Sequence, residues 1–189
     1  MKKVSVLMTA IMLTAASYAQ TWTVDKNHSK LGFTVTHLMI NDVDGIFKNF
    51  DATITSSKPD FSDAKFSLTA QTNSVFTDND KRDEHLKSAD FFDAASNPTI
   101  TFESKSIKKD GDKKFKLTGE LTMHGVTKTV VLDVSYKGPT TNPMSKKPDV
   151  GFNISGKIKR SDFKIGDKFG DAMVSDEVTL SAKGEFTQG

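Results

Sequence analysis

The sequence lacks cysteine and has no marked excess of either charge. Without cysteine, no disulfide can brace the fold and no thiolate can bind a metal. Two of the 26 basic residues, Lys2 and Lys3, lie at the extreme amino terminus, so the rest of the chain carries 24 basic and 24 acidic residues. Because binding to nucleic acid needs a clear positive excess or a basic stripe, we expect no nucleic-acid partner.

Signatures of common catalysts are also missing. The sequence has no Gly-x-Ser-x-Gly elbow and no glycine-rich phosphate loop. The four histidines, His28, His37, His85 and His124, do not have the close spacing of a zinc motif, although strands could still bring ligands together. We therefore predict a protein that is not an enzyme and that uses no metal or cofactor.

A long apolar run occurs only at the start. Lys2 and Lys3 precede an uncharged stretch that ends in Ser17-Tyr18-Ala19, with small residues at the positions a signal peptidase reads. The stretch is shorter than the roughly 20 residues that a spanning helix needs. We predict a signal peptide over residues 1–19, cleavage near Ala19, and a single exported domain over 20–189, periplasmic or secreted, with no stable membrane anchor.

Beyond that segment the dominant pattern is alternation of apolar and polar residues, typical of strands with one buried face. Val178 and Leu180, for example, alternate with Glu177 and Thr179. The same parity recurs along the chain. It assigns these residues to the inner face: Phe33, Val35, Phe66, Leu68, Ile100, Phe102, Leu117, Leu132, Val134, Phe152, Ile154, Val178 and Leu180.

Turn and helix signals divide the strands. Asp110-Gly111 and His124-Gly125 predict hairpin turns, and residues 80–88 predict the one clear helix, with Asp80 as its cap. Residues 137–149 contain three prolines and predict a long loop. We count eight or nine strands, so the fold class is all-β, an antiparallel barrel or sandwich.

Phenylalanine supplies 14 of the 17 aromatic residues, and its ring needs no hydrogen-bond partner. Such rings suit either a solid core or the dry wall of a cavity. Periodicity alone does not distinguish the two.

Several motifs, in order along the chain, resemble the YceI-like family of periplasmic, lipocalin-like proteins. The segments that carry the resemblance are Trp22-x-x-Asp25-x-x-His28-Ser29, Gly45-x-Phe47, Arg82-Asp83-x-His85-Leu86-x-Ser88-x-Asp90-Phe91-Phe92-Asp93, Pro98-x-Ile100-x-Phe102, Gly119-x-Leu121-Thr122-x-His124-Gly125, Arg160-Ser161-Asp162-Phe163 and Ser175-Asp176-Glu177-Val178.

This resemblance implies an eight-stranded antiparallel barrel whose long apolar cavity holds an isoprenoid lipid or quinone. The inner-face residues would then form the cavity wall, and a short helix or two with Phe91 and Phe92 would close one end. The resemblance thus adds Phe92 to the predicted cavity wall. The chain is compatible with a monomer or a dimer.

Polar residues cluster near the predicted helix and near Arg160. His37, Arg82, His85 and Arg160 are candidates for gripping a polar headgroup, with the arginines as donors. The alternative is a set of ion pairs and caps, including an Arg160–Asp162 pair, that pins the helix to the barrel rim. Beside the lipid carrier, two further functions stay open: a hydrolase or isomerase acting on such a lipid through His37, His85 or Arg82, and a structural or stress protein without ligand.

Overall fold

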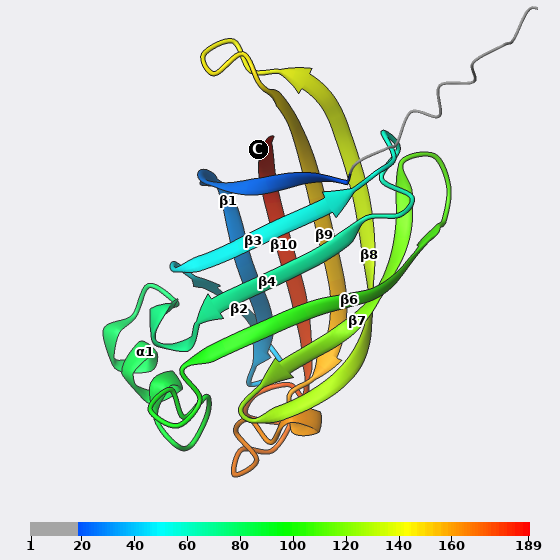
Figure 1. Cartoon of the computed structure of the whole chain (residues 1–189). Coiled ribbons are helices and arrows are strands. Elements are labelled where there is room, and N and C mark those ends of the chain that lie inside the picture. Colours follow the sequence, from blue (N-terminus) through cyan, green and yellow to red (C-terminus); the bar gives the residue numbers. More distant parts are fainter. Residues whose placement is uncertain (1–18) are drawn as a thin grey trace, which may run out of the picture.

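The computed structural model describes residues 19–189, and most of them lie in long antiparallel strands (Figure 1). Residues 1–18, which hold nearly all of the predicted signal peptide, lie outside the described residues. The strands are β1 (Gln20–His37), β2 (Asn41–Phe47), β3 (Phe50–Ser56), β4 (Lys65–Gln71), β5 (Val75–Phe76), β6 (Thr99–Lys109), β7 (Lys114–Met123), β8 (Val126–Thr141), β9 (Pro148–Lys159) and β10 (Glu177–Gln188).

Eight of these strands close into a ring in the order β1-β3-β4-β6-β7-β8-β9-β10, and β10 pairs back with β1. All pairings are antiparallel. The predicted eight-stranded all-β barrel is therefore confirmed. Each of the eight strands therefore has a paired neighbour on both sides over part of its length, which limits the edges that could pair with other chains.

Strand β1 pairs with both β3 and β2 on one side because it bends. Its first residues pair with β3 and its residues 31–37 pair with β2, while β10 runs along its other side. The bend coincides with a bulge between Asp25 and Lys30. There the Asp25 carboxylate accepts a hydrogen bond from Asn27 N at 2.9 Å and lies 2.8 Å from His28 Nδ1. The Asp25 side chain thus stabilises a local turn at the bulge.

Both predicted hairpin turns are present, one joining β6 to β7 at residues 110–113 and one joining β7 to β8 at His124-Gly125. His124 and Gly125 have φ values of 49° and 70°. Two consecutive positive φ values match the twist of the flanking strands, and glycine adopts one of them without strain.

The loop predicted over residues 137–149 is too long. Strand β8 continues to Thr141 and β9 begins at Pro148, so only residues 142–147 connect them. A register shift between Lys137 and Thr140 explains the difference. It places Pro139 in a bulge, where its missing N–H removes no ladder hydrogen bond.

The predicted helix is confirmed as α1 (Asp80–Lys87). Its cap is Asn79 rather than Asp80: the Asn79 side chain accepts a hydrogen bond from Arg82 N at 3.0 Å. Short 3-10 helices span Thr72–Ser74 and Ser161–Phe163. In Figure 1, α1, drawn in green, and the loop after β9, drawn in orange, lie at the same end of the barrel.

The opposite end of the barrel is filled with aromatic rings. The Phe61 ring lies 5.0 Å from Tyr136, 5.3 Å from Phe152 and 5.4 Å from Trp22, measured between ring centroids. Phe152 continues the cluster toward Phe66, at 5.3 Å. All five side chains are buried. The barrel is therefore solid at this end.

Candidate functional site

The half of the barrel next to α1 is hollow. It contains a cavity of about 300 Å³ and, deeper in the barrel, a second of about 140 Å³. The two adjoin, because Phe33, Phe47, Met123 and Leu180 line both. Together they form an elongated apolar space of the size class that holds small ligands.

Twelve of the fourteen predicted wall residues line this space. The outer cavity is bordered by Phe33, Val35, Phe92, Val178 and Leu180. The inner cavity is bordered by Phe33, Phe66, Leu68, Ile100, Phe102, Leu132, Phe152, Ile154 and Leu180.

Leu117 and Val134 lie outside both cavities, contrary to the prediction. They are 0% and 2% exposed and belong to the solid core, where Leu117 is paired with Leu132 and Val134 with Phe115 across β7 and β8. The alternation of apolar residues gives the face of the sheet correctly. It does not show how far along the barrel axis side chains fill the interior.

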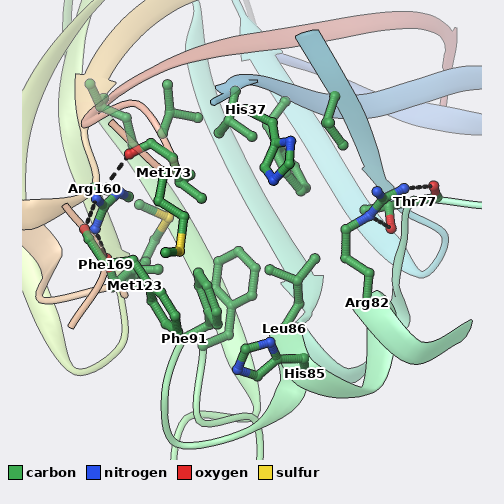
Figure 2. A pocket seen from close by; sticks show the side chains of 18 of the residues that line it. His37, Thr77, Arg82, His85, Leu86, Phe91, Met123, Arg160, Phe169 and Met173 are labelled. Atoms are coloured by element: carbon green, nitrogen blue, oxygen red, sulfur yellow. Dashed lines mark hydrogen bonds between the residues drawn. The ribbon is translucent and has the colours of Figure 1, made fainter. Parts of the chain in front are cut away.

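Arg160 organises the loop that borders the outer cavity. Its side chain is 6% exposed, and its Nε donates to Ser175 O. Nη1 donates to Ile165 O and Gly166 O, and Nη2 donates to Phe169 O and Val174 O. A guanidinium has five N–H donors, so all are satisfied by backbone carbonyls. Figure 2 shows Arg160 bound in this way beside Phe169.

This arrangement corrects two expectations about Arg160. The predicted pair with Asp162 is absent, because Asp162 is exposed and the carboxylate that Arg160 approaches is that of Asp171, at 4.0 Å. The headgroup-donor hypothesis also does not fit Arg160 here, since no N–H is left for a ligand. Its charge instead holds residues 165–175 against the barrel.

Arg82 and Asp83 anchor α1 through Thr77. Asp83 is buried and its Oδ1 accepts from Thr77 N at 2.8 Å and from Thr77 Oγ1 at 2.6 Å. Arg82 donates from Nε to Thr77 Oγ1 and from Nη2 to Thr77 O, at 2.7 and 2.6 Å (Figure 2). The Arg-Asp pair thus fixes the helix to the segment before it, while the Arg82 side chain borders the outer cavity.

A second set of contacts joins the helix region to the loop held by Arg160. Lys168 Nζ lies 2.6 Å from Asp90 Oδ1, and His85 Nε2 lies 3.5 Å from Asp90 Oδ2. The rings of Phe91 and Phe169 stack with centroids 4.9 Å apart, and the His85 ring meets both edge-on. We call these five residues the latch. The hydrogen bond from Lys168, followed by that from His85, holds the pKa of Asp90 below its usual value.

His37 lies on the opposite side of the outer cavity from the latch (Figure 2). It ends β1, it is exposed, and its backbone forms a bridge with Val174. Four polar residues were predicted at the rim. Among the described residues, backbone groups bind the side chains of Arg82 and Arg160 but not the rings of His37 and His85.

Several residues of the cavity wall are absent from the set predicted from the sequence. Phe47 and Phe91 lie in the family motifs, and Ile158 and Leu121 follow the inward parity, so a signal existed for these four. Phe169 and Met173 lie in the irregular loop after β9, where no periodicity exists to indicate them.

Within residues 19–189, one group of side chains has the proximity of metal ligands: Asp25, His28 and Glu185, whose ligand atoms lie within 4.8 Å of one another. None of these three residues lines either cavity, although their chain neighbours Val24, Ser29 and Gly184 border the inner one. Asp25 and His28 already share a hydrogen bond.

Comparison with known proteins places this barrel in a family. Residues 22–186 match the model of the YceI-like domain. The chain belongs to the YceI-like family. Protein YceI of Salmonella newport is 38% identical over 180 residues, which cover 94% of this chain and 93% of that protein. The family resemblance seen in the sequence is confirmed.

Solved structures agree with this placement. A Campylobacter jejuni YceI protein superposes with a TM-score of 0.75 at 37% identity, over 82% of this chain and 90% of that one. BcnA of Burkholderia cenocepacia gives a TM-score of 0.77 at 26% identity, over 86% and 98%. A polyisoprenoid binding domain from Saccharophagus degradans gives 0.68 at 16% identity, over 89% and 98%, which shows a common fold.

Proposed function

We propose that this chain binds an elongated isoprenoid lipid, of polyprenyl or quinone type, non-covalently inside the barrel and sequesters or carries it. The observation that carries the proposal is the pair of adjoining cavities, whose lining surface is almost entirely apolar. A fold shared with a domain described as polyisoprenoid-binding supports the same ligand class.

The physical basis is burial of apolar surface. An isoprenoid chain is long, thin and nearly free of hydrogen-bonding groups, so it loses almost no hydrogen bonds with water when it enters an apolar cavity. Burying about 300 Å² of such a chain at about 25 cal/mol per Å² contributes about 7.5 kcal/mol, which must exceed the cost of ordering the chain.

The polar end of the ligand would lie at the rim of the outer cavity. Arg160 has no free donor and Arg82 is held by Thr77, so His37 and His85 are the side chains best placed to meet a headgroup. Uncharged imidazole can donate one hydrogen bond, which suits a quinone carbonyl or an alcohol. A binding role is favoured over catalysis because Arg82, His85 and Arg160 are held by Thr77, Asp90 and backbone carbonyls rather than converging on one point in the cavity.

A cavity-filling variant tests this function. Leu180 borders both cavities, so Leu180→Trp should occupy the space at their junction without disturbing the solid end of the barrel. Val131, on β8, is 58% exposed and points outward, so Val131→Trp is the matched control.

Both variants and the parent would be titrated with pyrene-labelled polyprenol, with folding checked by circular dichroism. We expect at least a roughly tenfold weaker affinity for Leu180→Trp alone, equivalent to about 1.4 kcal/mol. Equal affinity for all three proteins would contradict binding in the cavity. Polyprenol recovered chemically unchanged after incubation would separate a carrier from a hydrolase or isomerase.

Export is part of the proposal. A carrier of this kind would act in the periplasm or outside the cell after cleavage near Ala19. The mass of the purified mature protein tests this, since cleavage there predicts Gln20 as the first residue.

A further inference from the structure

The turn between β1 and β2 exposes three consecutive apolar side chains. Leu38, Met39 and Ile40 are 50%, 75% and 83% exposed. Leu38 and Met39 also have positive φ values, 50° and 58°, in a place where hairpins normally use asparagine or glycine. The turn therefore exposes apolar surface and adopts a disfavoured backbone conformation at once. Such a combination points to a function for the exposed side chains.

The turn is continuous with the outer cavity. Leu38 N donates to Met173 O at 3.0 Å, and His37 bridges to Val174. His37, Met173 and Val174 all line the cavity, and Met173 is itself 48% exposed. We call Leu38, Met39, Ile40 and Met173 the apolar tip. The tip thus adjoins the outer cavity through Met173, which belongs to both.

We propose that the apolar tip docks transiently into the surface of a lipid bilayer, so that the outer cavity faces the membrane while ligand enters or leaves. The inference rests on the proposed function, because a lipid carrier must exchange its ligand with membranes. The described residues contain no helix long and apolar enough to span a bilayer.

The small size of the tip favours lipid over a protein partner. A stable protein interface buries roughly 800 Å² on each partner, more than four partly exposed side chains on one turn and its neighbour supply. Insertion of a few apolar side chains into a bilayer needs no matching surface. Such binding is weak and reversible, as a single acyl chain already gives only marginal attachment.

The proposed docking relies on insertion of apolar side chains and not on charge. The chain after Ala19 has equal numbers of acidic and basic residues. Attachment by insertion should therefore depend little on salt concentration, whereas attachment through basic patches weakens as salt screens the charges.

The test uses the exported, purified protein and vesicles of phosphatidylcholine. Flotation measures attachment, and movement of pyrene-labelled polyprenol from donor to acceptor vesicles measures exchange. The variant Met39→Asp with Ile40→Asp places charges on the tip, and aspartate tolerates the positive φ at position 39. Met144, 92% exposed on the loop between β8 and β9 at the other end of the barrel, provides the control Met144→Asp.

We expect the double variant to lose flotation and to exchange polyprenol at least roughly tenfold more slowly, with unchanged affinity for polyprenol in detergent. Met144→Asp should match the parent in all three measurements. Flotation or exchange of the double variant at the parental level would overturn the proposal, as would a parent that does not float. If no protein binds polyprenol in detergent, the proposed function fails, and flotation alone then decides whether the tip docks.

Discussion

Replacing Arg160 tests how the mouth of the cavity is built. Arg160→Met keeps the length of the side chain and removes five hydrogen bonds to the carbonyls of Ser175, Ile165, Gly166, Phe169 and Val174. Because the guanidinium is 6% exposed, these carbonyls have little access to water that could replace it. Removing one partner of a buried charged network typically costs about 3–5 kcal/mol, a large part of the roughly 5–15 kcal/mol that stabilises a domain.

Urea unfolding would measure this loss, with the fluorescence of the single, buried tryptophan, Trp22, as the probe. Amide hydrogen exchange would locate it: protection should fall first in residues 165–175. The control is Asp162→Asn, whose carboxylate is exposed and should change stability by less than about 0.5 kcal/mol. A loss below about 1 kcal/mol for Arg160→Met, with unchanged exchange in the loop, would refute the role assigned to Arg160.

Single contacts at the latch, the tip and the helix cap give three further predictions. Lys168→Met removes the Lys168–Asp90 pair of the latch and should speed release of pyrene-polyprenol at neutral pH, measured by stopped-flow fluorescence. The pKa of Asp90 is lower in the folded protein than its unfolded value of about 3.9, so Asp90 stabilises the latch fully above that pH. This stabilisation is lost as the pH falls through the folded pKa, and release by the parent should therefore quicken only below about pH 4. Met39→Asn relieves the positive φ of the tip and should raise the free energy of unfolding by about 1 kcal/mol, which unchanged urea midpoints would contradict. Asn79→Ala removes the cap of α1 and should cost about 1 kcal/mol in the same assay, with faster exchange of the amides in the first turn of the helix.

Local patterns in the sequence predicted the features that depend on near neighbours. Alternation gave the inner face of the strands, and the Asp110-Gly111 and His124-Gly125 turns gave the hairpins. The helix over residues 80–87 followed from its polar first turn, although the cap lies one residue earlier, at Asn79.

Features that depend on distant segments were beyond such patterns. Leu117 and Leu132 share the inward parity and are paired across β7 and β8, yet only Leu132 borders a cavity, because the filling of the barrel interior depends on rings from many strands. Arg160 binds a loop with no periodicity, so its neighbour Asp162 was the only partner that the sequence offered. Pro139 fits in a strand because a bulge surrounds it, which depends on the register with β9.

The most direct test of the central claim is denaturing extraction of the protein purified from its native host, followed by mass spectrometry of the organic phase. Binding in the barrel predicts one isoprenoid lipid per chain, enriched over the bulk lipids and absent from Leu180→Trp. An extract that contains no isoprenoid, from a protein that also fails to take up polyprenol when it is supplied, would contradict the account.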